Sequence, residues 1–306
     1  MKITKGQYKD VPAVCVETEK LFVKFLPQYG CRLQSVIDKA TGREFMALDD
    51  QMDFLPQSLG GNYIEGDVSG CDDMFPTIDP MTLNEGSRAG VEYPCHGEVC
   101  RVPHEVESLE DRIITRYTSR TLHYHYQKII EESENGGIAI RYCITNLAKD
   151  DFHCMWAAHF MIAAEEGGYA VTPYEDGTQG EIMFDEQSQF GRRGEVFGVG
   201  KTALTSGRFS KDANAYKFFF LEKLPLGECG YFVPSVSKTL KLKFEKDKLP
   251  YLGVWVNNGA FKEMYNVAME VATAPFDKPE TAMQRGIDFK IAPGETFTFQ
   301  FAVEIE

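Results

Sequence analysis

The feature of this sequence that most constrains its fold is an alternation of apolar and polar residues with a period of two. In the run Thr296–Ile305 (TFTFQFAVEI), phenylalanine, valine and isoleucine occupy every second position. The runs Lys238–Phe244 and Ile138–Ile144 alternate in the same way. Because successive side chains of a β-strand point to opposite faces of a sheet, this pattern predicts half-buried strands.

Other segments also favour β-structure. Leu21–Phe25 is a short apolar strand candidate, and Ser35–Gly42 is a strand that runs into a tight turn. Arg112–Tyr126 is β-prone along its length, and the turn residues Glu134–Gly137 suit a hairpin. No segment carries an amphipathic helix longer than a turn or two. Many strands with few helices predict an all-β chain, built as a large antiparallel β-sandwich.

Length and composition indicate one domain spanning residues 1–306. The chain has 306 residues, of which 43% are hydrophobic, so it can bury a substantial core. No linker rich in proline, glycine or serine divides it, and no repeat is visible. The stretch 51–95 is irregular and rich in glycine and aspartate, and long segments of this kind in compact domains are often functional.

Charge and cysteine usage narrow the partners and the compartment. The formal net charge is −14, from 46 acidic and 32 basic residues, which disfavours nucleic acid and anionic membrane surfaces as partners. The eight cysteines form no CxxC pair, and several lie in apolar runs. The N-terminal residues lack an apolar signal core, and no stretch approaches 18 apolar residues. We therefore expect a reduced, cytoplasmic protein.

Three residues are candidates for acid–base chemistry. Glu270 follows an apolar strand run and precedes a proline-containing loop, where an acidic side chain is either paired or held for chemistry. His159 lies in the apolar run Cys154–Ile162, where an imidazole needs a hydrogen-bond partner or a cavity. His96 precedes Gly97 just after the long loop. Each histidine could equally be a satisfied structural residue.

Other titratable groups suggest weaker alternatives. His123 and His125 form an H-x-H pair that could chelate a metal from one strand face, although an ordinary strand is the simpler interpretation. Asp72 and Asp73 are adjacent carboxylates that could bind hydroxyl groups or Ca²⁺, or could cap a turn. The sequence contains no dinucleotide-binding glycine motif after a strand, no Walker loop, no serine-hydrolase elbow and no H-E-x-x-H motif, which removes those classes.

In their order along the chain, these motifs resemble the aldose 1-epimerase (galactose mutarotase-like) superfamily over nearly the whole length. The similar segments are Val23–Glu44, His96-Gly97, Trp156–His159, Met269-Glu270 with Pro275 and Phe276, and Ile291–Glu295. The resemblance implies a β-supersandwich fold and anomer interconversion of a small-molecule carbohydrate without cofactor or metal. It also implies that Glu270 is the base and His159 the acid, with His96 polarising the sugar oxygens.

The sequence departs from the family at the residues that select the sugar. The family's Asn-Arg pair corresponds to Asn62 followed by Tyr63, and the context of Arg88 does not match. Asp176 and Asp185 are candidates for the family's binding aspartate by position only. We expect the sugar contacts to come from the following residues: Asn62, Asp73, Glu98 and the aromatic pair Trp156 and Trp255.

Two functions from different classes fit these residues. The first is an aldose 1-epimerase-like isomerase acting on an aldose or uronate. The second is a carbohydrate-binding protein of the same fold without turnover, because one fold hosts many functions. A metal-dependent enzyme using His123 and His125 is a third alternative. The sequence sets neither the sugar nor the oligomeric state.

Overall fold

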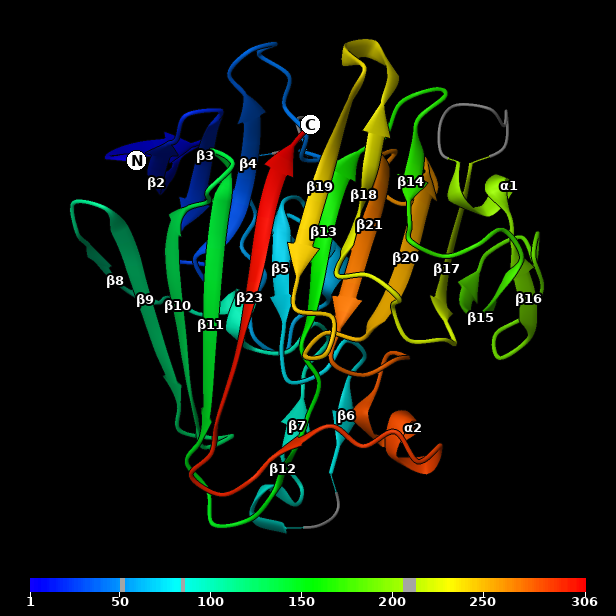
Figure 1. Ribbon diagram of the computed structural model, residues 1–306. Helices are drawn as coiled ribbons and strands as arrows, with labels where there is room; N and C mark the ends of the chain where they lie inside the picture. The colour runs from blue at the N-terminus through cyan, green and yellow to red at the C-terminus, as the bar shows by residue number, and fades with distance from the viewer. Residues whose placement is uncertain (50–52, 84–85, 206–212) are drawn as a thin grey trace.

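The computed structural model describes residues 1–49, 53–83, 86–205 and 213–306. Within these ranges the strands form one 11-stranded and one 8-stranded sheet, which Figure 1 shows as two stacked layers. In spatial order the larger sheet contains β1 (Lys2–Tyr8), β2 (Val11–Glu17), β3 (Leu21–Leu26), β4 (Arg32–Asp38), β5 (Cys71–Met74), β13 (Ala157–Ala163), β21 (Tyr265–Ala272), β20 (Tyr251–Asn258), β17 (Asn214–Phe220), β15 (Thr178–Asp185) and β16 (Val196–Val199).

The second layer and the small elements complete the fold. The 8-stranded sheet contains β14 (Tyr169–Val171), β18 (Glu228–Val233), β19 (Lys238–Phe244), β23 (Thr296–Ile305), β11 (Ile138–Asn146), β10 (Tyr124–Glu132), β9 (Arg112–Ser119) and β8 (Glu105–Ser108). The strand pairs β6 (Met81–Thr82) with β7 (Glu92–Tyr93) and β12 (Phe152–His153) with β22 (Lys290–Ile291) lie at the lower end of Figure 1, near α2 (Pro279–Gln284). The remaining helical turns are α1 (Lys201–Leu204), η1 (Tyr63–Glu65), η2 (Gly86–Arg88), η3 (Val99–Arg101) and η4 (Pro234–Val236).

The predicted all-β, antiparallel fold class is confirmed. The alternating runs at 238–244 and 296–305 are the strands β19 and β23, and the turn at 134–137 joins β10 to β11. The β-prone stretch 112–126 divides into β9 and the start of β10, because the chain reverses after Ser119 and His123 adopts φ 51°. His123 therefore lies in a turn, so it does not share a strand face with His125 as the metal alternative required. No helix in the described ranges has the length and apolar character needed to cross a bilayer.

The main hydrophobic core fills the space between the two layers. Trp156 lies just before β13, is 0% exposed, and its ring centroid is 4.6 Å from that of Phe299 on β23. Its indole Nε1–H donates to the Tyr126 hydroxyl at 2.8 Å. The prediction that Trp156 stacks on a sugar does not fit this position, because the ring is fully buried in the core and its N–H is already bonded to Tyr126.

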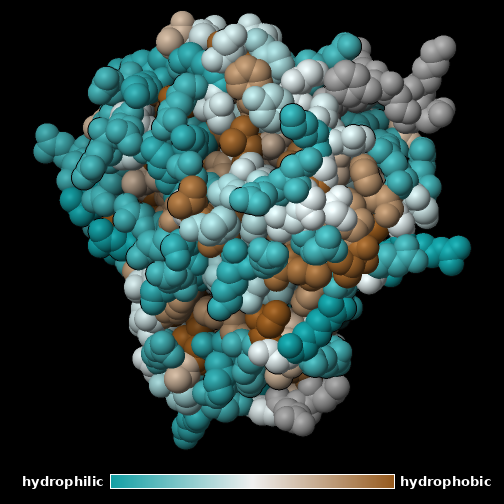
Figure 2. All heavy atoms as spheres, turned by 45° about the vertical axis from the view of Figure 1, so that its right-hand side comes forward, coloured by the Kyte–Doolittle hydropathy of each residue, from teal (hydrophilic) through white to brown (hydrophobic). Residues whose placement is uncertain are grey.

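Strand alternation gives the larger sheet a second face, turned away from the main core. On β13, Ala158, Phe160 and Ile162 belong to the main core, so His159 and Met161 point to the opposite side of the sheet. The face drawn in Figure 2 is mostly hydrophilic, with hydrophobic patches that include ones in its right and lower parts. The outward face of the larger sheet is where the candidate site lies.

Candidate functional site

Three acid–base groups lie in one row across neighbouring strands of the larger sheet. Asp72 on β5 is paired with His159 on β13. His159 in turn faces Glu270 on β21, because the flanking pairs are Ala157–Ala272 and Phe160–Met269. Side chains of directly opposed residues share a face of the sheet, so the row brings two carboxylates and an imidazole to one surface.

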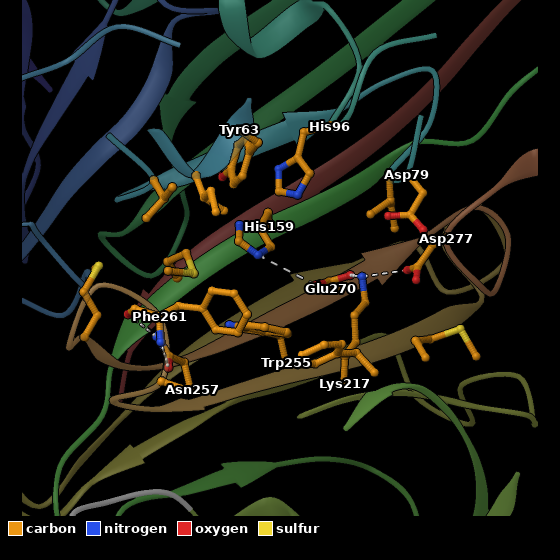
Figure 3. Close-up of a pocket in the computed structure, with 18 of the residues that line it drawn as sticks. Tyr63, Asp79, His96, His159, Lys217, Trp255, Asn257, Phe261, Glu270 and Asp277 are labelled. Atoms are coloured by element: carbon orange, nitrogen blue, oxygen red, sulfur yellow. Dashed lines mark hydrogen bonds and ion pairs between the residues drawn. The ribbon is translucent and has the colours of Figure 1, made fainter. Parts of the chain in front are cut away.

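His159 and Glu270 of this row line a cavity of about 510 Å³, and Asp72 lies outside its lining. Figure 3 shows His159 and Glu270 near its centre, Asp277 and Lys217 on one side, and Trp255 and Phe261 on the other. The volume lies within the usual range for small-molecule sites. The cavity is lined by Tyr63, Ile64, Val68, Ile78, Asp79, His96, His159, Met161, Met183, Phe184, Arg193, Lys217, Trp255, Asn257, Ala260, Phe261, Lys262, Met264, Glu270 and Asp277.

Glu270 is buried and has two different partners. Its Oε2 lies 2.6 Å from Lys217 Nζ, and its Oε1 lies 3.8 Å from His159 Nε2. The same Lys217 ammonium lies 2.7 Å from Asp277 Oδ1. Burial raises the pKa of Glu270 to about 7, against the opposing effect of Lys217. A carboxyl group with a pKa near neutrality can both take up and release a proton at physiological pH.

A glycine places an aromatic ring beside this carboxylate. Glu270 is paired with Gly253 on β20, and Gly253 with Phe219 on β17. A Cβ atom at Gly253 would lie 2.8 Å from the Phe219 ring, so the ring occupies the space that a side chain would take. Lys217 belongs to the neighbouring row, opposite Trp255, and its side chain reaches across to Glu270.

His159 is a buried imidazole in an electropositive setting. Burial, His96 and Lys217 hold the pKa of His159 well below its ordinary value. Its Nδ1 has no hydrogen-bond partner among the described residues, while Nε2 points to Glu270. The ring centroids of His96 and His159 are 4.8 Å apart, edge to face. Burial lowers the pKa of His96 too, opposed by Asp72.

Asp72 connects the site to a buried arginine. Arg32 Nε on β4 lies 2.9 Å from Asp72 Oδ1, and the Tyr63 hydroxyl donates to Oδ2 at 2.8 Å. Nδ1 of His96 lies 3.5 Å from the same Oδ2. Burial acts to raise the pKa of Asp72, but Arg32 and His96 outweigh it and hold the pKa well below its ordinary value. Asp72 is therefore an ionised group that orients His96 towards the cavity.

A metal ion is an alternative ligand for three of these side chains. The ligand atoms of Asp72, His96 and His159 lie within 4.8 Å of one another, close enough to coordinate one ion. The guanidinium of Arg32 does not fit that use, because it is a fixed positive charge in direct contact with the only carboxylate of the set. A second cation at this carboxylate would be repelled in a poorly solvated site. The charges of these residues therefore do not fit a metal ion.

The predicted catalytic candidates His96, His159 and Glu270 come together at the cavity, and Trp255 joins them. Trp255 packs beside Phe184 and Phe261, with ring centroids 5.7 and 5.3 Å away. The roles assigned to these residues stay predictions.

The other predicted sugar contacts lie elsewhere. Asp73 faces the core, where its carboxylate is 2.8 Å from Lys128 Nζ and accepts from Tyr142. Glu98 is buried beside Tyr117 and Tyr124 and is not among the cavity residues. Asn62 caps η1 by accepting from Ile64 N at 3.3 Å and is not among the cavity residues. These positions correct the expectation that the three side chains contact a ligand in this cavity.

Arg88, whose context does not match the family arginine, and the two positional candidates for the family aspartate also lie outside this cavity. The Arg88 side chain donates to Leu122 O and Asn146 Oδ1, away from the cavity. Asp176 lines a different hollow, and Asp185 accepts from Phe190 N. None of these three residues lines the cavity that holds Glu270.

Sequence reasoning missed Lys217 and Asp277, as well as the role of Asp72 and Arg32. Lys217 is the single charged residue in the apolar strand Asn214–Phe220 (NAYKFFF), which was an available signal. A lysine inside such a run requires a buried partner. Asp277 gave no comparable signal, because it lies in a loop after Pro275 and Phe276.

Comparison with known proteins identifies the fold. No protein-family model matches the chain, and no curated relative matches it. Solved structures do. The Slr1438 protein from Synechocystis sp. PCC 6803 aligns with TM-score 0.71 and 13% identity over 98% of each chain. A galactose mutarotase-like protein from Clostridium acetobutylicum aligns with TM-score 0.69 and 13% identity over 100% of this chain and 98% of that one.

A galactose mutarotase related enzyme from Lactobacillus acidophilus aligns with TM-score 0.63 and 15% identity over 96% of this chain and 97% of that one. The resemblance to the galactose mutarotase-like group inferred from the motifs is thus confirmed for the fold. At these identities the likeness establishes the fold alone.

Proposed function

We propose that this protein interconverts the anomers of a reducing sugar by acid–base ring opening, as an aldose 1-epimerase-like isomerase. The observation that carries the proposal is the pair formed by Glu270 and His159, whose Oε1 and Nε2 atoms lie 3.8 Å apart on one wall of a substrate-sized cavity. The reaction needs one group that accepts a proton beside one that donates a proton, because it removes one proton from the sugar and supplies another.

The proposed step balances protons and electrons. Glu270 removes the proton of the anomeric hydroxyl, the bond between C1 and the ring oxygen breaks, and its electron pair stays on the ring oxygen. Protonated His159 gives that oxygen a proton. Rotation about the C1–C2 bond presents the other face of the aldehyde, and the reverse transfers close the ring as the other anomer. The step is written without a cofactor.

Protonation of the pair matters for this assignment. The pKa of Glu270 is raised to about 7 and that of His159 is lowered by burial, so the two groups together carry one proton below neutral pH. The proposed catalytic form has that proton on His159, and the resting form has it on Glu270. Such coupled groups titrate as a pair. Catalysis uses the form in which His159 is protonated and Glu270 is ionised.

Two further cavity residues have roles in this proposal. His96, oriented by Asp72 at 3.5 Å, is placed to hydrogen-bond the sugar oxygens. The face of Trp255, with Phe184 and Phe261, supplies an apolar wall for the C–H side of a sugar ring.

The test is anomer exchange by NMR over a panel of aldoses, uronates and sugar phosphates. Wild type should accelerate at least one sugar, and Glu270→Gln should lose on the order of 10²–10⁴ of that acceleration. Glu304→Gln is the matched control, since Glu304 is also a buried strand carboxylate but lies on the other sheet. A sugar that binds without any acceleration would replace this proposal with the carbohydrate-binding alternative.

A further inference from the structure

We propose that Lys217 is a positioning residue for Glu270: its ammonium, held between Glu270 and Asp277, fixes one carboxylate oxygen and supplies the counter-charge that lets the other oxygen act as the base. The inference deepens the proposed function and rests on it for its kinetic readout. Lys217 needs no contact with the sugar for this role.

The geometry divides the two oxygens of Glu270 between different tasks. Oε2 is 2.6 Å from the Lys217 ammonium, and Oε1 is 3.8 Å from the His159 imidazole. The ammonium also lies 2.7 Å from Asp277 Oδ1, so it is tethered on both sides. The Lys217 side chain is 9% exposed and that of Glu270 is 2% exposed. Lys217 therefore prevents rotation of the carboxylate and leaves only Oε1 for proton exchange.

The charges around Glu270 show why one lysine matters. Lys217 reaches it from β17 and His159 from β13. Asp277, in the loop after β21, and Asp79 add negative charge nearby, and each acts to raise the pKa of Glu270. Arg193 lies 3.4 Å from Asp79 and 3.9 Å from Asp277, but it is 65% exposed and well solvated. Lys217 is the one buried cation in direct contact with the Glu270 carboxylate among the described residues.

Substitutions of Lys217 and of Asp277 should shift the pKa of Glu270 in opposite directions. Replacing Lys217 with methionine removes the counter-charge, so ionised Glu270 becomes less favourable and its pKa rises. Replacing Asp277 with asparagine removes a competing anion, leaves the ammonium to Glu270 alone, and lowers that pKa. An opposite charge at this range shifts a carboxyl pKa by about 1–3 units.

The experiment compares Lys217→Met, Lys217→Arg and Asp277→Asn with wild type. The first readout is the pH profile of kcat/KM for anomer exchange, and the second is the NMR titration of the Glu270 carboxyl carbon, assigned by its loss in Glu270→Gln. We expect the alkaline limb and the NMR midpoint to rise by about one pH unit or more in Lys217→Met. Both should fall in Asp277→Asn and stay close to wild type in Lys217→Arg.

A matched control separates this role from general stabilisation by a lysine that bridges two carboxylates. Lys243 Nζ lies 2.6 Å from Glu304 and 3.2 Å from Glu306, on the other sheet. Lys243→Met should leave both readouts unchanged. Unshifted midpoints in both Lys217→Met and Asp277→Asn would overturn the inference. If Lys217→Met does not fold, Asp277→Asn keeps Lys217 in place and carries the test alone.

The two proposals fail in distinguishable ways. If wild type accelerates no sugar, the proposed function is wrong, and the NMR titration of Glu270 still decides whether Lys217 sets its ionisation. If wild type is active and the midpoints do not move, the function stands and Lys217 is only a structural ion pair.

Discussion

His159 and Glu270 face each other on β13 and β21, and Nε2 of the histidine lies 3.8 Å from Oε1 of the glutamate. This separation is longer than a hydrogen bond, so the two groups are not hydrogen-bonded to each other and each can contact a ligand. Both open onto the same cavity, where one sugar ring can contact them together. The pair is defined by strand register, which makes its geometry a property of the sheet and not of a loop.

The first prediction concerns pH. The pKa of Glu270 is raised to about 7 and that of His159 is lowered, so the pair loses its single proton as the pH rises through about 7. Because His159 must give a proton to the ring oxygen, kcat/KM should fall above that pH. The profile is measured from about pH 5 to about pH 9, with uncatalysed exchange subtracted. A kcat/KM that instead climbs through neutrality would mean that neutral His159 only polarises the ring oxygen.

The second prediction concerns the buried Arg32–Asp72 ion pair. Arg32→Met leaves the Asp72 carboxylate without its counter-charge, which should lower the free energy of unfolding by about 3–5 kcal/mol at neutral pH. The pKa of Asp72 is depressed in the folded state, so its stabilising contribution is present above the unfolded value of about 3.9 and is lost as the pH falls below it. The difference between variant and wild type should therefore shrink in acid.

Urea unfolding at neutral and acidic pH measures this difference. Arg116→Met is the control, because Arg116 pairs with Glu107 at the surface, 3.0 Å away, and such pairs contribute at most about 1 kcal/mol. An Arg32→Met variant as stable as the control at neutral pH would show that Asp72 is neutralised by other means.

How far the sequence predicts the site depends on strand alternation. Composition and period-two patterning predict the layers, and the histidines and Glu270 follow from their motifs. The adjacent residues Asp72 and Asp73, however, point to opposite faces of β5: one contacts Arg32, the other Lys128 in the core. A shift of the strand register by one residue would exchange the faces to which Asp72 and Asp73 point. β5 has only four residues, with aspartate at both central positions, so its sequence does not indicate which register is correct.

The charged network behind the site was harder to predict. Arg32, Lys217 and Asp277 come from distant segments: Arg32 on β4 pairs with Asp72, and Lys217 on β17 pairs with Asp277 in the loop after β21. A buried lysine in an aromatic strand implies a buried anion but does not say which one. Pairing across the sheet, which supplies that information, is non-local and is not encoded in any single motif.

The third prediction contrasts the two tryptophans. Trp255 lines the cavity, so Trp255→Ala should raise KM for the sugar, with a loss of stacking of about 0.5–1.5 kcal/mol beyond area burial. Trp156 is fully buried, so Trp156→Ala should cost about 3–5 kcal/mol of stability. Measuring KM and thermal unfolding for both variants separates binding from packing. Equal effects of the two variants on KM would contradict the assigned positions.

The fourth prediction concerns the glycine beside the base. In Gly253→Ala the new Cβ would lie 2.8, 2.9 and 3.0 Å from three atoms of the Phe219 ring, so the ring must move. Overpacking of this kind costs about 1–3 kcal/mol of stability. Lys217 Nζ lies 5.5 Å from the centre of the same ring, so a displaced Phe219 also disturbs the Lys217–Glu270 contact. Activity should therefore fall along with stability.

The double variant Gly253→Ala/Phe219→Leu decides whether the ring is the cause. A smaller side chain at position 219 makes room for the new methyl group and should restore part of the lost kcat/KM. Gly200→Ala is the control, because its Cβ would meet its nearest neighbour at an ordinary 3.5 Å and Gly200 is not among the cavity residues. If the double variant is no more active than Gly253→Ala, Phe219 is not the group through which Gly253 acts. Full activity in the single variant would show that Glu270 keeps its place without the space that Gly253 provides.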